Sequence, residues 1–218
     1  TCDLLSLAAP GVRTLQPYLP GKPESELRRE YGLSDIVKLA SNENPLGPSP
    51  RALTAIREAL SGLARYPDGN GFELKAALSA KLGLSTATLT LGNGSNDVLE
   101  LVARAFLTPE HEAVFSEHAF AVYPIVTQAI GATARVAKAN PPDHAMPYGH
   151  DPAALLALIN DRTRVVFVAN PNNPTGTWLK TGELEAFLEA IPESVIAVVD
   201  EAYFEYVEAD ADCPNALR

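Results

Sequence analysis

The sequence lacks most marks of a secreted, membrane-bound or metal-binding protein. Only two of its 218 residues are cysteines, Cys2 and Cys213, and their wide separation matches neither a metal site nor a redox motif. No apolar run is long enough to cross a bilayer and no secretory signal is evident, so we expect a cytoplasmic protein with reduced thiols. The four histidines lack metal-ligand spacing, and we expect them at the surface or in loops: His111, His118, His144 and His150.

Basic residues are also scarce, at 17 against 27 acidic residues, which gives a net charge of −10. No basic stripe exists that could neutralise a phosphate backbone, so nucleic acid is not expected as a partner. The hydrophobic content of 46% is ordinary for a soluble globular protein, and the chain is long enough to bury a full core.

The first forty residues are irregular and rich in proline, with one short helical candidate at residues 24–31. This pattern indicates an extended N-terminal arm. After a loop at 41–48, Ser49 can cap a helix that has Pro50 at its first position. A second helix is expected after the turn at 67–71.

From residue 88 onward, short apolar runs alternate with helical patterns. We expect strands at 88–91, 113–116, 132–137, 164–169 and 194–199. We expect helices at about 96–107, 121–130, 152–160 and 181–191. Strands separated by helices predict an α/β fold with a mostly parallel sheet and flanking helices.

A glycine-rich turn, Leu91-Gly92-Asn93-Gly94-Ser95-Asn96-Asp97, leads into one of these helices. Glycine lets the backbone approach an anion closely, and the free N–H groups at a helix start bind it. Ser95 would add a hydroxyl donor. The alternative is a tight turn in which Ser95 or Asn96 only caps the helix. The turn matches neither the dinucleotide fingerprint nor the nucleotide P-loop.

The next two motifs follow apolar runs that we expect to be neighbouring strands. In Asn173-Pro174-Thr175-Gly176, the proline restricts the backbone so that Asn173 is presented rigidly and can donate to a phenolic oxygen. Asp200 ends the run 194–199, with Tyr203 three residues later. A carboxylate there could keep a pyridine nitrogen protonated, because a nearby opposite charge raises the pKa of the base. The alternatives are an ordinary asparagine–proline turn and an N-cap role for Asp200.

Three aromatic residues are weaker candidates. Phe120 follows the strand expected at 113–116, where it could lie flat against a ring, although burial in the core is the commoner fate of phenylalanine. Tyr66 and Tyr18 lie in irregular segments, where a buried tyrosine needs a hydrogen-bond partner.

The combination of motifs resembles the fold type I pyridoxal-phosphate aminotransferases, and within them the histidinol-phosphate aminotransferase family. Besides the motifs above, the likeness is carried by three segments: Pro17-Tyr18-x-Pro-Gly-Lys22, Leu39-Ala40-Ser41-Asn42-Glu43-Asn44-Pro45 and Arg65-Tyr66-Pro67-Asp68. It extends from about Pro17 to Tyr203, which is nearly the whole chain.

The resemblance implies a role for each matching residue. Ser95, Asn96 and the Gly94 backbone would hold the phosphate of pyridoxal 5′-phosphate, and Phe120 would stack on its ring. Asn173 and Tyr203 would bind the ring oxygen and Asp200 the ring nitrogen, so these three are the catalytic candidates. Tyr66 would reach the site of a neighbouring subunit in a homodimer. Tyr18 and Asn44 would face the substrate.

One departure from the family pattern concerns the lysine that forms the Schiff base, which in this family follows the Asp-x-x-Tyr segment. None of the lysines among these 218 residues stands in that context. We therefore expect an arm and substrate loop at 1–45 and an incomplete cofactor domain at 46–218, without the C-terminal part of the family fold. The 218 residues alone are expected to be inactive.

The leading functional prediction is transamination between L-histidinol phosphate and 2-oxoglutarate, yielding imidazole acetol phosphate and L-glutamate in histidine biosynthesis. An aromatic-amino-acid transaminase and a threonine-phosphate decarboxylase share these motifs and remain alternatives. An alternative of another class is a truncated, non-catalytic module that binds the cofactor or a partner without turnover.

Overall fold

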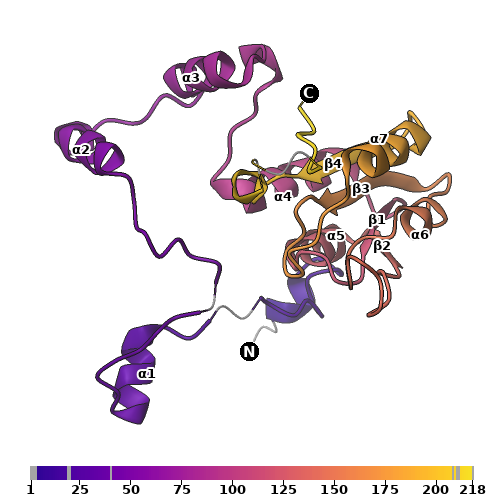
Figure 1. Cartoon of the computed structure of the whole chain (residues 1–218), viewed down its shortest axis with the longest axis horizontal. Helices are drawn as coiled ribbons and strands as arrows, with labels where there is room; N and C mark the ends of the chain where they lie inside the picture. The colour runs from indigo at the N-terminus through magenta and orange to yellow at the C-terminus, as the bar shows by residue number, and fades with distance from the viewer. Residues whose placement is uncertain (1–3, 19–20, 40, 208, 210–211, 218) are drawn as a thin grey trace. The chain divides into compact units, whose positions relative to one another are not determined.

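The structure is a computed structural model that describes residues 4–18, 21–39, 41–207, 209 and 212–217. Its contacts divide the chain into two units (Figure 1). One contains Thr1–Pro17 together with Gly92–Arg218, and the other contains Tyr18–Leu91. The arm and cofactor-domain boundary expected at residue 45 stays a prediction.

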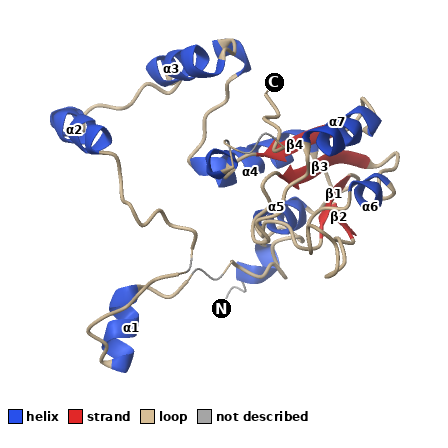
Figure 2. Cartoon of the chain, in the orientation of Figure 1, coloured by secondary structure: helices blue, strands red, loops and turns tan. Residues whose placement is uncertain are grey.

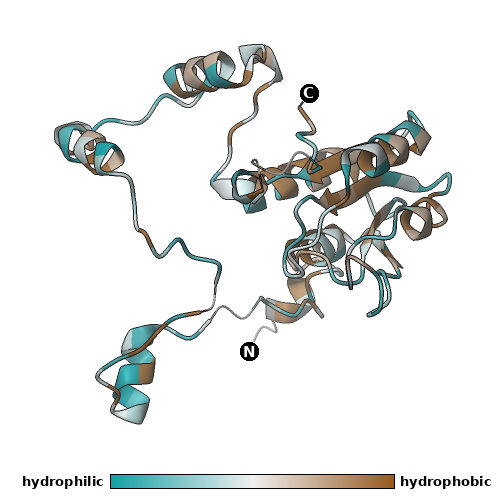
Figure 3. Ribbon diagram, viewed as in Figure 1, coloured by the Kyte–Doolittle hydropathy of each residue, from teal (hydrophilic) through white to brown (hydrophobic). Residues whose placement is uncertain are grey.

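The larger unit is built on four parallel strands, β1 (Glu112–Ser116), β2 (Thr133–Ala137), β3 (Thr163–Ala169) and β4 (Ile196–Asp200). Their order in the sheet is β2-β1-β3-β4, and every pair is parallel. Parallel strands covered on both faces need continuous apolar sequences, and these strands are largely apolar (Figure 3). The predicted α/β fold with a parallel sheet is confirmed.

Helices cover both faces of this sheet (Figure 2). On one face α4 (Gly94–Phe106) and α5 (Val122–Ile130) share a buried cluster with Val165, Phe167 and Ala169 of β3. On the other face α6 (Pro152–Leu156) and α7 (Thr181–Ala190) pack with Val166 and Val168. Because successive strand residues point to opposite faces, β3 contributes to both cores, which makes it the centre of a three-layer unit.

The ends of these helices follow local sequence rules. The Asp151 side chain accepts hydrogen bonds from the Ala153 and Ala154 amides and so caps α6, with Pro152 at its first position. This helix is shorter than the expected range 152–160. After Leu156 the backbone hydrogen bonds of Leu158 and Ile159 reach back three residues, so the chain tightens into turns while both side chains stay on the core.

The second unit contains α1 (Glu24–Tyr31), α2 (Pro50–Ala59) and α3 (Phe72–Leu82), together with the short 3₁₀ segments Leu60–Gly62 and Thr86–Thr88. Ser49 caps α2 through its hydroxyl, as predicted. The prediction of a strand at 88–91 was wrong. A strand needs a neighbour for its backbone groups, and within the described residues this segment pairs with none; Thr86–Thr88 instead forms a turn capped by Ser85.

Candidate active site

The carboxyl ends of β3 and β4 lie side by side. Ala169 is in register with Asp200, and the Asn170 amide donates a 2.9 Å hydrogen bond to the Asp200 carbonyl. A small pocket opens at this edge. Its lining consists of Ser95, Phe120, Ala169, Pro171, Asn173, Asp200, Ala202 and Tyr203. The carboxyl edge of a parallel sheet is the usual ligand position in such folds.

Asp200 is half-buried and its two carboxylate oxygens are held by different donors. The Tyr123 hydroxyl donates to Oδ2 at 2.9 Å, and the Ala202 amide donates to Oδ1 at 3.2 Å. The cap-like contact with Ala202 exists, but it accounts for only one of the two oxygens. The carboxylate is therefore fixed in orientation at the pocket wall.

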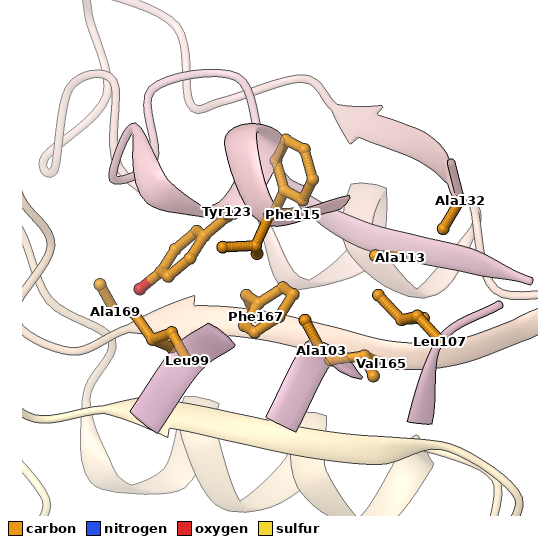
Figure 4. Packing of buried hydrophobic residues seen from close by; sticks show 11 residues of the cluster. Leu99, Ala103, Leu107, Ala113, Phe115, Tyr123, Ala132, Val165, Phe167 and Ala169 are labelled. Atoms are coloured by element: carbon orange, nitrogen blue, oxygen red, sulfur yellow. The ribbon is translucent and has the colours of Figure 1, made fainter. Parts of the chain in front are cut away.

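Tyr123 lies on α5, fully buried among the residues of the first core cluster (Figure 4). Its ring stacks on Phe167 with centroids 4.8 Å apart and meets Phe120 edge-on at 5.9 Å. Burial and the neighbouring Asp200 carboxylate raise the pKa of Tyr123 above its ordinary value, so the hydroxyl remains a donor. Sequence analysis missed this residue. The available signal was a tyrosine inside an apolar helix, which must find a polar partner when buried.

Three asparagines in the loop after β3 have different surroundings. Asn170 is fully buried; its Oδ1 accepts from the Leu179 amide at 2.7 Å and its Nδ2 donates to the Leu179 carbonyl at 3.3 Å. Asn172 is also buried, and its Nδ2 donates to the His118 carbonyl and to the Thr175 hydroxyl. Of the three, only Asn173, the candidate taken from the sequence, lines the pocket. Asn170 and Asn172 were not singled out there, because their partners lie far along the chain or across the loop.

The glycine-rich turn leads directly into α4. Gly94 has a φ of 74°, a left-handed conformation that favours glycine. Asn93 occupies the N-cap position and donates its own amide to Oδ2 of Asp97 at 3.0 Å. Ser95 and Asn96 are therefore not the cap residues. Ser95 lines the pocket, and Gly94 and Asn96 stand in the same helical turn, whose N–H groups have no partner within the helix.

Two further candidates from the sequence line the same pocket, Phe120 and Tyr203. Tyr203 also lies against Tyr206, with ring centroids 6.3 Å apart. Phe120 is only partly buried, so it contributes both to the pocket wall and to the core behind it.

The other three candidates, Tyr18, Asn44 and Tyr66, belong to the second unit. Within that unit Tyr18 and Tyr66 are exposed, and Asn44 Oδ1 accepts from the Leu46 amide at 3.0 Å in a turn. Their proposed contacts with cofactor and substrate stay predictions.

His150 lies in a loop, one of the two positions expected for the histidines, but it is buried there and only 4% exposed. Its Nε2 lies 3.0 Å from the Ala169 carbonyl, which can only accept, so the imidazole donates there. Burial lowers the pKa of His150 to about 4. Within the described ranges no three His, Cys, Asp or Glu side chains gather as a metal site, and no helix is long and apolar enough to cross a membrane.

Residues 34–217 match the family described as aminotransferase class I and II. The chain belongs to this family. It is 60% identical over 217 residues to histidinol-phosphate aminotransferase 2 of Pseudomonas fluorescens and, equally, to that of Pseudomonas aeruginosa. Each alignment covers 99% of this chain but only 57% of the relative, so the chain spans little more than half of their length.

The fold agrees with that assignment. The crystal structure of histidinol-phosphate aminotransferase from Sinorhizobium meliloti in complex with pyridoxal-5′-phosphate superposes with a TM-score of 0.81 at 29% identity. The match covers 94% of this chain and 53% of that one. An N-succinyldiaminopimelate aminotransferase from Mycobacterium tuberculosis matches with a TM-score of 0.68 at 26% identity.

Proposed function

We propose that this chain forms the cofactor-binding part of a pyridoxal-phosphate-dependent histidinol-phosphate aminotransferase. The observation that carries the proposal is the convergence of Asp200, Asn173 and Tyr203 with Phe120 and Ser95 around one pocket. The 60% identity to histidinol-phosphate aminotransferases supports the choice of substrate among the family's activities.

The donor set of the pocket fits the chemical groups of pyridoxal 5′-phosphate. Asp200 offers a carboxylate to the ring nitrogen, and Asn173 and Tyr203 offer an amide and a hydroxyl to the ring oxygen. Phe120 supplies an apolar wall for the ring. The Ser95 hydroxyl and the Asn96 N–H in the first turn of α4 suit a phosphate, whereas the Gly94 N–H donates to the Gly92 carbonyl at 3.0 Å.

When bound, the cofactor supplies an electron sink for the charge left when the substrate loses its α-proton. Asp200 supports this by holding a proton on the ring nitrogen, since an opposite charge nearby raises the pKa of a base. Tyr123 fixes the direction of that carboxylate through its hydrogen bond to Oδ2. Asn173 and Tyr203 orient the ring by donating to its oxygen.

We further propose that turnover needs a lysine from outside these 218 residues. The six lysines are Lys22, Lys38, Lys75, Lys81, Lys138 and Lys180, and none of them stands in the sequence context of the family's Schiff-base lysine. The two lysines that belong to the larger unit, Lys138 and Lys180, do not line the pocket. The 218-residue chain is therefore expected to bind cofactor without catalysing transamination.

A chimeric enzyme tests the proposal. Residues 1–217 would replace the matching segment of histidinol-phosphate aminotransferase 2 from Pseudomonas aeruginosa, whose remaining length supplies the rest of the fold. We expect pyridoxal phosphate binding, seen as visible absorption, and glutamate formation from histidinol phosphate and 2-oxoglutarate. Asp200→Ala in the same chimera is the inactive control.

The chimera also separates the alternatives. Turnover of phenylalanine without turnover of histidinol phosphate would favour the aromatic transaminase, and release of carbon dioxide from threonine phosphate would favour the decarboxylase. A folded chimera that binds pyridoxal phosphate but turns over none of these substrates would support the non-catalytic module. The cytoplasmic location stays a prediction.

Homodimerisation is part of the proposal, with Tyr66 reaching the neighbouring subunit's cofactor phosphate. The complete exposure of the Tyr66 side chain leaves it available for such a contact. Mixing Tyr66→Ala and Asp200→Ala chimeras tests this, because a hybrid dimer would regain one site with both residues. Partial recovery of activity is expected, and no recovery after subunit exchange would contradict a contribution across the interface.

A further inference from the structure

Asn172 stands between two residues of the pocket wall without lining the pocket itself. Pro171 and Asn173 on either side are wall residues, whereas the Asn172 side chain turns into the protein and the residue is 3% exposed. Nothing in the chemistry proposed above uses it. Its buried position and its polar side chain together require another explanation.

The Asn172 amide group joins two separate loops. Nδ2 donates at 2.8 Å to the carbonyl of His118, 54 positions earlier, and at 2.7 Å to the Thr175 hydroxyl within its own loop. The backbone also fixes Asn172 in its loop, because its amide donates to the Thr177 carbonyl and its carbonyl accepts from the Gly176 amide. The loop after β3 is thus closed on itself and tied to the loop after β1.

The anchored carbonyl is close to Phe120 along the chain. His118 lies in the turn after β1, in which the Ala119 amide donates to the Ser116 carbonyl, and Phe120 follows two residues later. The Phe120 carbonyl then accepts from the Tyr123 amide at the start of α5. Holding the His118 carbonyl therefore restrains the short segment that presents Phe120 to the pocket.

We propose that Asn172 is a positioning residue that clamps the loop carrying Phe120 to the loop carrying Asn173. This inference rests on the proposed function, in which Phe120 and Asn173 contact the same cofactor ring. The clamp sets the separation of these two walls before the cofactor arrives. A binding site whose walls are held in advance loses less conformational freedom on binding.

The clamp needs an amide, not merely a polar group of this size. A carbonyl only accepts, so the group facing His118 must be a donor. Oδ1 of Asn172 is buried and accepts no hydrogen bond from the described residues. An aspartate would have nearly the same shape but would place an acceptor against the His118 carbonyl.

Hydrogen–deuterium exchange of the 218-residue chain without cofactor tests the clamp directly. In Asn172→Asp we expect amide exchange in residues 117–121 to become about tenfold faster. In this variant, opening of the turn no longer has to break the hydrogen bond from Asn172 to the His118 carbonyl. Exchange in β4 should stay unchanged. Thr175→Val removes the hydrogen bonds of the Thr175 hydroxyl with Asn172 and Thr177, both inside the Asn173 loop. It keeps the bond to His118, so it should leave residues 117–121 at the wild-type rate.

A destabilised control separates positioning from general loss of stability. Leu155→Ala opens a cavity in the core cluster under α6 and α7, which includes none of Asn172, His118 and Thr175. It should not accelerate exchange selectively in residues 117–121. If Asn172→Asp does not fold, Asn172→Ala removes both donors without adding a charge and is measured in the same way.

The consequence for the site is measured as the dissociation constant for pyridoxal phosphate in the chimera. We expect Asn172→Asp to raise it about tenfold. Unchanged exchange in residues 117–121, or faster exchange with an unchanged dissociation constant, would overturn the inference. Failure of the unmodified chimera to bind pyridoxal phosphate would instead refute the proposed function, and the exchange result would still report whether the clamp exists.

Discussion

The Tyr123 hydroxyl and the Asp200 carboxylate are joined by a 2.9 Å hydrogen bond across 77 positions of sequence. Tyr123 belongs to a helix on one face of the sheet, whereas Asp200 is the last residue of an edge strand. The bond therefore ties the apolar core under α5 to the wall of the pocket. A carboxylate held in this way keeps one direction toward its ligand.

Replacing Tyr123 by phenylalanine removes this hydrogen bond while the stacked ring remains. Hydrogen bonds to charged groups contribute roughly 1.5–3 kcal/mol, so we expect kcat/KM of the chimera for histidinol phosphate to fall roughly 10- to 100-fold. Steady-state kinetics measure the change. Tyr206→Phe makes the same chemical change at an exposed ring and should leave kcat/KM near the wild-type value. Equal losses in the two variants would contradict a specific role for Tyr123.

Substitutions at Asn170 and Asn173 should affect different properties, the first the stability of the fold and the second the binding of the cofactor. Asn170→Ala leaves the buried Leu179 amide and carbonyl without their side-chain partner, which we expect to lower the free energy of unfolding by roughly 2–4 kcal/mol. Asn173→Ala alters a pocket-lining residue, so it should weaken pyridoxal phosphate binding with less than about 1 kcal/mol lost in stability. Urea unfolding of the 218-residue chain and cofactor titration of the chimera measure the two effects. The reverse ranking in either measurement would contradict these assignments.

The parallel sheet could be predicted from the sequence because its strands are local apolar runs with turns on both sides. The strand expected at 164–169 shows this well, since its residues 165–169 are buried on both faces and form an uninterrupted apolar segment. Residues 88–91 alternate threonine with leucine, a pattern that also predicts a strand, but they form none. Strand formation depends on a pairing partner that a short window of sequence does not contain. The early end of α6 at Leu156 depends likewise on packing that the helical pattern does not encode.

The pocket wall could be predicted where a residue's own chemistry marks it, as at Asp200 and Asn173. The supporting residues could not, because their partners are distant along the chain. Asn172 contacts His118, and Tyr123 contacts Asp200, only after the sheet has formed. A buried hydrogen bond between segments leaves little trace in the local sequence beyond a polar residue in an apolar surrounding.

His150 should make the stability of the chain depend on pH. Burial lowers its pKa to about 4, below the ordinary value of 6.5, so the unfolded state binds the proton more readily. The stabilisation is fully present above about pH 6.5 and is lost as the pH falls toward 4. Between pH 7.5 and 5 the loss begins at about pH 6.5, so it extends over about 1.5 pH units. We therefore expect His150 to lower the free energy of unfolding by about 2 kcal/mol over this interval.

Urea unfolding at pH 7.5 and pH 5 measures this contribution. His150→Gln keeps a donor for the Ala169 carbonyl but removes the titrating group, so its stability should fall by about 2 kcal/mol less over the same interval. Leu155→Ala lowers stability through a cavity, with no titrating group involved, and should keep the wild-type difference between the two pH values. An unchanged pH dependence in His150→Gln would show that other groups cause it.

Glu112 lies at the amino ends of the parallel strands, where it is the first residue of the central strand β1. Its carboxylate is buried among hydrogen-bond donors. Asn160 Nδ2 lies 2.8 Å from Oε2, Arg135 Nε lies 3.5 Å from the same oxygen, and Arg162 Nη1 lies 3.3 Å from Oε1. The Glu112 side chain is 5% exposed, whereas both arginines are about half exposed. The carboxylate therefore joins the starts of three neighbouring strands.

Glu112→Gln keeps the shape of this side chain but places an amide among donors and leaves two arginines without their counter-charge. Breaking a fully buried ion pair costs about 3–5 kcal/mol. Because solvent surrounds both arginines, we expect a smaller loss here, roughly 1–3 kcal/mol in the free energy of unfolding. Glu100→Gln provides the matched control, because its 2.7 Å pair with Arg104 is exposed and should contribute less than about 0.5 kcal/mol. Urea unfolding of both variants gives the comparison, and an equal loss in the two would show that burial at the start of β1 does not strengthen the Glu112 cluster.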